Sequence, residues 1–438
     1  MTLYKLFLCI LTASICVSCK PKFDEPEPDS GDINASNYVA LGSSMTAGYA
    51  NGALYYDAQQ NSYAVILAEQ FKVIGGGEFK IPNVSAGSVG MGNNNNAYSI
   101  MGTRTDCQGT SSLGPVKIAT SGDVAVFNPV YNTQGPFHNM GVPDVKVIDM
   151  AVTSYTNPFY QRISSSASSS VLSDAVAKNP TFFSVMLGLD DVLDYALKGG
   201  ATGNITPVAG GVGVGFEASI NNLIDQLTAN GSKGVIANIP SIKTLAYYNT
   251  IAWNALKLTQ AKADSLTEVY WNYDSTKFYE GNNPFIIEDA SIPFIELRPI
   301  KEGEFVLLNV PLDSIKCHKW GSLKPLPNRF VLTMQEIDAI ESAINNYNLI
   351  LKNLALSKGL AFVDANSFFT KVKNGYMYNG VAVNAAFASG GFFSLDGLNL
   401  TPRGNALLAN EFIKAINSKY HSTIPESDAM KYPAVIFP

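Results

Sequence analysis

The sequence predicts an α/β protein in which a mostly parallel sheet is covered by helices on both faces. Short apolar runs, each of a length that suits a buried strand, alternate along the chain with longer segments that have helical periodicity. The composition agrees, because 46% of the 438 residues are hydrophobic and only 15% are charged, which allows a large buried core. In sheets of this kind the chemistry lies at the carboxyl ends of the strands.

The predicted strands are apolar runs that end in turn-forming residues. The first, Tyr38 to Leu41, stops abruptly at Gly42-Ser43-Ser44. The other strands are expected, in chain order, at residues 145–152, 182–188, 234–240 and 360–365.

Helices are expected between these strands, because apolar residues recur there at helical spacing. The last helix is the best defined, since Thr401 suits its N-cap and Pro402 its first position. The predicted helices span residues 62–71, 169–179, 216–231, 335–357 and 402–418.

Two regions do not follow this alternation of strands and helices. Residues 75–135 are rich in glycine and asparagine and give no clear pattern. Residues 241–330 begin with an aromatic-rich helical stretch and continue into residues 294–311, which alternate like a small hairpin. We interpret residues 241–330 as an insertion that caps or flanks a core domain within residues 37–438.

The N-terminus has the pattern of a secretory signal. Lys5 precedes an apolar run at residues 6–17, and Ser18 and Cys19 follow it. The pattern predicts a signal peptide at residues 1–18 and resembles that of bacterial lipoproteins, in which Cys19 would become the lipidated first residue. The alternative is an ordinary secretory signal with an accidental cysteine. The run is too short for a membrane-spanning helix, which needs about 20 residues.

The segment after the signal, residues 19–36, is rich in proline and acidic side chains and is predicted to be a flexible tether. We therefore expect a lipid-anchored protein of the cell envelope, in the outer membrane, at its periplasmic or its surface face. The net charge of −6 and the absence of a Lys/Arg run argue against a nucleic-acid partner.

Two cysteines remain once the signal has been removed and Cys19 has taken the lipid. Cys107 and Cys317 either pair with each other in an oxidising compartment or stay separate thiols. The sequence indicates no cofactor.

Four segments resemble the sequence blocks of the SGNH (GDSL-type) hydrolases, which are serine esterases, lipases and glycan deacetylases. The segments follow the order of that family and lie at the ends of predicted strands or helices. The resemblance extends from about Tyr38 to the C-terminus, is greatest to envelope lipoproteins of the family, and implies a three-layer α/β/α sandwich of the flavodoxin-like kind. The four segments are residues 38–55, 138–147, 182–191 and 393–404.

The positions that carry catalysis in this family are only partly kept. Ser44 stands at the nucleophile position and Asp396 at the position of the triad acid. Asn399 stands where the Asp-x-x-His motif of the family has its histidine. Two residues donate to the oxyanion in the family. The usual glycine matches Asp144, to within a few residues, and the usual asparagine matches Asp190.

These replacements act against acyl transfer. The amide of Asn399 cannot accept a proton from Ser44, and an ionised Asp190 would place negative charge where the oxyanion develops. His138, just before the second block, is the histidine that could replace the base, since His318 lies in the insertion and His421 in the tail.

The resemblance and its degenerate blocks together predict a catalytically impaired lipoprotein. It would use its cleft or its insertion to bind a glycan, a lipid or a partner in the outer membrane. The alternative is an active serine esterase or lipase, acting on carbohydrate or lipid esters with a base from elsewhere in the chain. If Asp144, Asp190 and Asp396 converge they could hold Ca²⁺, but an acidic pocket without a metal is expected.

Overall fold

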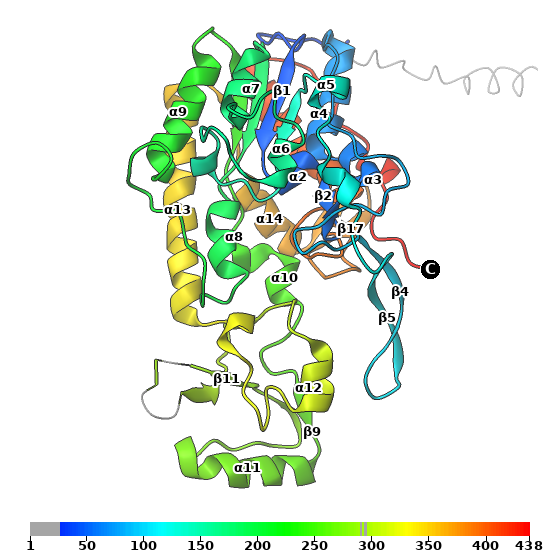
Figure 1. Ribbon diagram of the computed structural model, residues 1–438, viewed down its shortest axis with the longest axis vertical. Helices are drawn as coiled ribbons and strands as arrows, with labels where there is room; N and C mark the ends of the chain where they lie inside the picture. The colour runs from blue at the N-terminus through cyan, green and yellow to red at the C-terminus, as the bar shows by residue number, and fades with distance from the viewer. Residues whose placement is uncertain (1–26, 290, 293–295) are drawn as a thin grey trace, which may run out of the picture.

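A five-stranded parallel sheet forms the centre of the computed structural model, which describes residues 27–289, 291–292 and 296–438 (Figure 1). Its strand order is β15-β8-β7-β1-β6. Every residue of β1 and of β7 is buried, as expected for strands with helices on both faces. The strands are β1 (Tyr38–Gly42), β6 (Asn139–Gly141), β7 (Phe182–Met186), β8 (Lys233–Ala237) and β15 (Ala361–Val363).

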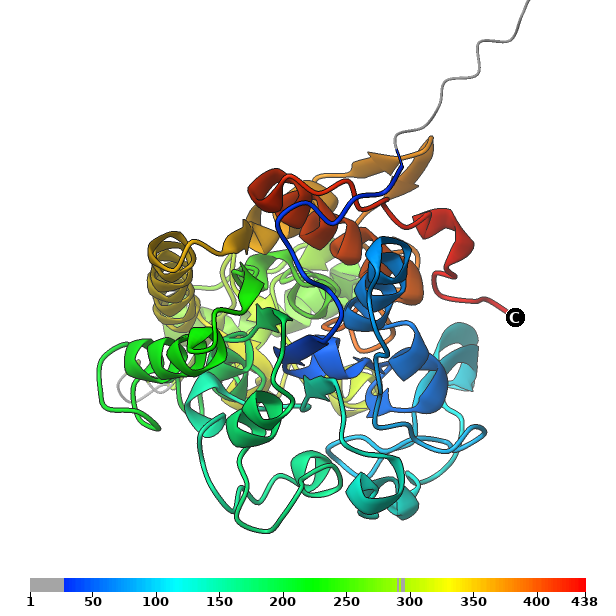
Figure 2. The same cartoon turned by 90° about the horizontal axis from the view of Figure 1, so that it is seen from above.

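Helices form a layer on each side of this sheet, which confirms the predicted three-layer α/β/α architecture (Figure 2). On one face α4 (Tyr63–Phe71) packs against α15 (Pro402–Tyr420). The other face carries α7 (Val171–Ala177), α9 (Phe216–Thr228) and α13 (Met334–Ser357). All five helices were expected from the sequence, with bounds that differ by a few residues.

The strand order places a topological switch point between β1 and β7. The chain goes from β1 to β6 on one side and then crosses to β7 on the other side of β1. Neighbouring connections therefore leave the sheet in opposite directions, which opens a crevice at the carboxyl ends of these strands. This crevice is where ligands bind in sheets of this kind.

The second strand of the chain is not where the sequence placed it. Residues 145–152 form a loop with the short 3-10 helix η4 (Val147–Asp149), and β6 lies earlier. The apolar side chains of Val145, Val147 and Met150 are buried, but they pack beneath the loop instead of joining the sheet. The prediction was wrong because a buried apolar run need not be a strand.

A long hairpin fills part of the region that gave no pattern. β4 (Ser99–Thr105) and β5 (Ser111–Lys117) pair antiparallel over seven residues each. The hairpin extends from the core alongside the insertion (Figure 1). Both of its faces are largely exposed, so the sequence lacks the alternation of apolar and polar residues that marks a half-buried strand.

The segment expected to be an insertion leaves the sheet after β8 and has two small cores of its own. Its predicted hairpin at residues 294–311 does not form. Instead β12 (Leu297–Pro299) pairs with β11 (Ile286–Glu288), and β13 (Phe305–Val306) pairs with β14 (Val331–Leu332). Alternation identified β12 and β13 as strands but not their partners.

A disulfide joins the hairpin to the insertion. Cys107, at the tip of the hairpin, pairs with Cys317 in α12 (Leu312–His318). Beside it Lys316 Nζ lies 2.7 Å from Asp106 Oδ2. The two cysteines are therefore partners, and the hairpin is fixed across the space between the core and the insertion.

The described part of the predicted tether, residues 27–36, is packed against the core. The Asp32 amide donates to Tyr420 O at the end of α15 at 2.8 Å, and Ile33 and Ala35 are buried. The prediction of a flexible tether is therefore wrong for this part. The predicted signal peptide and Cys19 lie outside the described residues. Within the described part of the chain, no helix is both long and apolar enough to cross a membrane.

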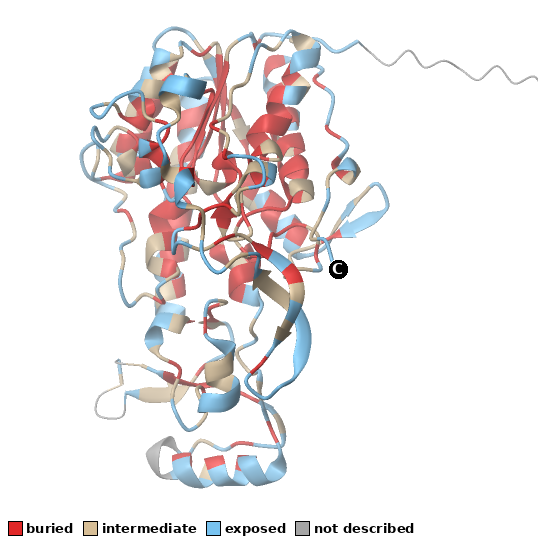
Figure 3. Cartoon of the chain, turned by 45° about the vertical axis from the view of Figure 1, so that its right-hand side comes forward, coloured by how far each residue is buried: buried red, intermediate tan, exposed pale blue. Residues whose placement is uncertain are grey.

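Buried side chains concentrate in the sheet and on the inner faces of its helices (Figure 3). The hairpin and much of the insertion are exposed or only half-buried. The core therefore gives a rigid platform at the carboxyl ends of the strands, and the two peripheral elements form walls around it.

Candidate functional site

A cleft of about 980 Å³ lies at the switch point between β1 and β7. The core forms its floor, and the hairpin and the insertion contribute its walls. All five residues that the sequence singled out line this cleft. They are Ser44, Asp144, Asp190, Asp396 and Asn399.

Ser44 is the first residue of α2 (Ser44–Ala47), directly after the turn that follows β1. Such a strand-to-helix turn exposes a hydroxyl at the edge of the sheet. The turn is tight, because a side chain at Gly42 would collide with Thr46. A hydroxyl held in this way can meet a ligand in the cleft.

Asp144 supplies a backbone donor to the serine. Its amide donates to Ser44 Oγ at 3.4 Å. Its φ of +62° lies in the left-handed region, which favours glycine, the residue of the family at this position. The left-handed backbone and the amide contact support the assignment of Asp144 to this position. The Asp144 amide is therefore within hydrogen-bond reach of the Ser44 hydroxyl.

Asp396 and Asn399 form a closely bonded pair. The backbone amides of Leu398 and Asn399 donate to Asp396 Oδ1 at 2.9 and 2.8 Å. Asn399 Nδ2 donates to Asp396 Oδ2 at 3.1 Å, as a histidine Nδ1–H does in a triad. Asn399 thus reproduces the orienting hydrogen bond of a triad, but an amide has no basic atom to take a proton from Ser44.

Asp190 begins α8 (Asp190–Ala196), directly beyond β7, and is only 7% exposed. Burial first, and then the charge of Asp144, raises the pKa of its carboxyl from 3.8 to about 8. At neutral pH most of this carboxyl is therefore protonated, and it can donate a hydrogen bond to an oxyanion. The sequence predicts an ionised Asp190, and burial overturns that prediction.

Two more carboxyls near this edge of the sheet hold protons more tightly than usual. Desolvation by the walls of the cleft raises the pKa of Asp144 to about 6, although the residue itself is exposed. Burial raises the pKa of Asp191, which accepts from the Val147 amide at 2.9 Å, to about 7. Among the described residues, no group of three or more acidic, histidine or cysteine side chains is arranged to hold a metal ion.

None of the three histidines of the chain lines the cleft. His138 precedes the amino end of β6, whereas Ser44 follows the carboxyl end of the parallel strand β1. Its Nδ1 accepts from the Lys80 amide at 3.0 Å, and burial and nearby lysines lower its pKa to about 4. His318 is in α12, and His421 follows α15 and pairs with Asp32. His138 is therefore not the missing base.

Sequence reasoning missed the basic side chains of the cleft, because it left the hairpin unassigned. Arg104 of β4 and Lys117 of β5 both line it. Arg104 pairs with Asp313 of the insertion at 3.7 Å. The Lys117 amine lies beside Gly52, whose amide donates to Asp396 at 3.2 Å. Desolvation lowers the pKa of Lys117, and the charge of Asp396 raises it in part.

Polar and aromatic side chains complete the lining. Tyr49 and Tyr247 contribute rings, and three asparagines of one loop, Asn93, Asn94 and Asn96, contribute amides. Rings and amides suit a ligand with apolar faces and hydroxyl groups.

Comparison with known proteins gives matches at the level of structure alone. No protein-family model and no curated protein matches the chain. A catalytic mutant of an acetylxylan esterase from Geobacillus stearothermophilus is 12% identical, with a TM-score of 0.37, and the match covers 88% of this chain and 96% of that one.

Two further solved structures match over similar lengths. An α/β hydrolase from the metagenome of Lake Arreo, Spain, is 11% identical, with a TM-score of 0.37, over 88% of this chain and 96% of that one. A GDSL-like lipase candidate from Parabacteroides merdae is 12% identical, with a TM-score of 0.35, over 89% and 99%. At these low identities and TM-scores, the chemistry of the cleft has to be judged from its own residues.

Proposed function

We propose that this chain is an envelope lipoprotein of the SGNH-hydrolase family, anchored through Cys19, that binds a glycan or lipid ester in its cleft without hydrolysing it efficiently. A single observation supports the proposed loss of catalysis. Asn399 occupies the position of the base, hydrogen-bonded to Asp396 at 3.1 Å, and no histidine lines the cleft. Serine is a poor nucleophile without a base, so binding can persist where turnover fails.

The cleft supports a sugar-containing ligand. Its volume of about 980 Å³ is at the upper end of the usual range for ligand sites, about 300–1,000 Å³. The half-buried Tyr49 offers a ring against which a sugar can stack, and the asparagine loop offers amide donors and acceptors. A protein partner in the outer membrane would bind outside this cleft.

A second candidate function is an active serine esterase that uses Lys117 as its base. The observation that favours it is the partly desolvated Lys117 amine on the wall of the cleft that adjoins Asp396. Desolvation lowers the pKa of a lysine and so frees it to accept a proton, and serine–lysine pairs do serve in catalysis.

Ester hydrolysis distinguishes the two functions. We expect the purified chain to hydrolyse aryl acetates no faster than Ser44→Ala, and a fluorophosphonate to label Ser44 no faster than a surface serine. The reason is that the Asn399 amide cannot take the proton of Ser44 and no histidine lines the cleft. Hydrolysis that disappears in both Ser44→Ala and Lys117→Met, but survives in the surface control Lys419→Met, would establish the lysine-dependent esterase instead.

Membrane attachment is tested separately. We expect Cys19→Ala to move the chain from the membrane fraction to the soluble fraction, or to leave it unprocessed, because the lipid would be the anchor. Fractionation with an immunoblot measures the distribution, and mass spectrometry of the N-terminus measures the processing. Cys107→Ala is the matched control and should stay with the membrane. Full membrane association and normal processing of Cys19→Ala would contradict the lipoprotein assignment.

A further inference from the structure

The insertion carries a second groove, far from the cleft. One wall is a face of α11 (Gln260–Asp274), and the other is the segment that follows it, residues 277–279. The opposite face of α11 packs into one of the two small cores, through Ala263, Leu266 and Tyr270. The groove has a volume of about 610 Å³. It is lined by Gln260, Asp264, Thr267, Glu268, Trp271 and Lys277–Tyr279.

Two large aromatic side chains of this groove are left in solvent. Trp271 is 52% exposed and Tyr279 is 62% exposed. Neither side chain has a hydrogen bond or a ring contact within the described residues. Neighbouring aromatic residues do not share this exposure, since Tyr270 and Phe278 are buried. Exposed aromatic rings gathered in one groove are typical of an interaction site.

The polar residues of the groove indicate which ligand suits it. The Gln260 amide bonds to Asp264 Oδ1 at 2.7 Å, and Glu268 and Lys277 add a further carboxylate and an amine. A sugar has an apolar face and hydroxyl groups at its edge. Aromatic rings stack on the face, and polar side chains hydrogen-bond to the hydroxyl groups, so this lining suits a sugar. Two carboxylates against one amine leave the groove acidic, which disfavours anionic polymers and anionic lipid.

We infer that this groove, defined by Trp271 and Tyr279, binds a neutral polysaccharide. It is a second binding site, separate from the cleft at Ser44. The rings stack on successive sugars, and Gln260, Asp264 and Glu268 accept or donate hydrogen bonds at their hydroxyl groups.

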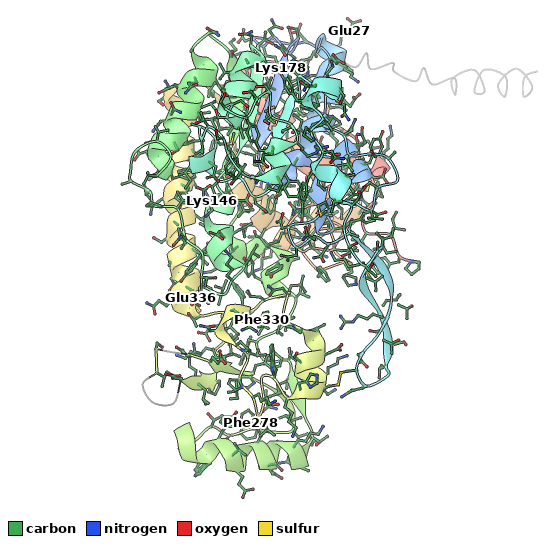
Figure 4. All side chains as sticks on the ribbon, in the orientation of Figure 1. Glu27, Lys146, Lys178, Phe278, Phe330 and Glu336 are labelled. Atoms are coloured by element: carbon green, nitrogen blue, oxygen red, sulfur yellow. A yellow bond between two sulfur atoms is a disulfide. The ribbon has the colours of Figure 1, made fainter. Side chains whose placement is uncertain are left out.

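The orientation of the molecule agrees with this assignment. Glu27 and Phe278 lie at opposite ends of its long axis (Figure 4). If Cys19 is lipidated, as proposed above, the groove is at the end that points away from the membrane, where a polymer is accessible. The orientation relative to the membrane rests on the proposed lipid anchor, whereas binding at the groove does not depend on it.

Binding of the full mature chain in detergent to insoluble cellulose, xylan and mannan tests the inference. We expect at least one of these neutral polysaccharides to retain the chain. Trp271→Ala and Tyr279→Ala should each weaken retention at least tenfold, because each removes a stacking ring. Trp271→Phe and Tyr279→Phe should keep most of the affinity. Both positions are exposed, so the melting temperature should stay unchanged, which calorimetry measures.

Two controls separate this groove from other surfaces. Leu349→Ala removes an equally exposed apolar side chain from α13 and should leave retention unchanged. Ser44→Ala should also leave it unchanged, so a failed cleft hypothesis and a failed groove hypothesis give different results. The inference is overturned if no neutral polysaccharide retains the chain, or if both alanine variants bind as tightly as the unmodified protein. It is also overturned if these variants instead lose binding to vesicles of anionic lipid.

Discussion

Asn399→His should make Ser44 react with a fluorophosphonate about 100-fold faster than in the unmodified chain, which is within the usual contribution of general-base catalysis. The Asn399 amide already occupies the place of an imidazole N–H, with its hydrogen bond to Asp396 at 3.1 Å. A histidine there would be oriented by the same carboxylate and would offer its second nitrogen to the serine. The Asp144 amide also lies 3.4 Å from Ser44 Oγ, and the raised pKa of Asp190 favours a neutral carboxyl that can donate a hydrogen bond to an oxyanion.

The pH profile of this variant identifies the donors. Labelling should rise as the new imidazole loses its proton, near the ordinary histidine pKa of about 6.5. It should fall again near pH 8, because Asp190 then ionises and repels the developing oxyanion. The double variant Asn399→His with Asp190→Asn should lose the alkaline fall and keep the acid limb.

The matched control for this experiment is Asn399→Gln, which keeps an amide and gains no base. Rates of labelling over pH 5 to 10 are measured by gel fluorescence or intact mass. If Asn399→His, folded to the same melting temperature, labels no faster than Asn399→Gln, then position 399 is not the position of the base. In that case the proposed loss of catalysis has another cause.

The free energy of unfolding should fall by a few kcal/mol between pH 5 and pH 9, and Asp190→Asn should remove much of that fall. Burial raises the pKa of Asp190 from 3.8 to about 8 in the folded state. Between those values the folded chain binds more protons than the unfolded chain, so stability decreases as the pH rises. The contribution is fully present below about pH 4 and is lost as the pH passes through 8.

An asparagine at position 190 does not ionise, so its folded state lacks this penalty. A smaller fall should remain, because burial also raises the pKa of Asp191 to about 7. Urea unfolding at pH 5, 7 and 9 gives the free energies. Asp338→Asn, an exposed position on α13, is the control and should keep the full fall. A chain equally stable at pH 5 and pH 9 would contradict the buried, neutral Asp190.

Local sequence was enough to predict most of the core. β1, β7, β8 and β15 are mostly apolar runs, and α15 has its cap at Thr401 and its proline at the first position. These signals act within a few residues, so they can be recognised without knowing what the segment packs against. The same holds for the order of the cleft residues, since Ser44, Asp190 and Asp396 each follow a strand end or precede a helix.

What the sequence could not predict depends on partners that are distant in the chain. β6 forms at Asn139–Gly141 because that segment lies alongside β1, whereas residues 145–152 are more apolar yet form a loop. A segment joins a sheet only if a neighbouring strand can pair with its backbone. An apolar run predicts that its side chains are buried, but it does not predict such a pairing.

The chemistry of the cleft shows the same division. From the sequence, the resemblance to SGNH hydrolases predicts that Ser44 stands at the nucleophile position, Asn399 at the position of the base and two aspartates at the oxyanion positions. The folded structure alone shows the burial and the nearby charge of Asp144 that raise the pKa of Asp190. It likewise decided that Cys107 pairs with Cys317, 210 residues away, and that Lys117 reaches the cleft. Ionisation and cross-linking are set by what surrounds a group in space, and a linear sequence does not contain those distances.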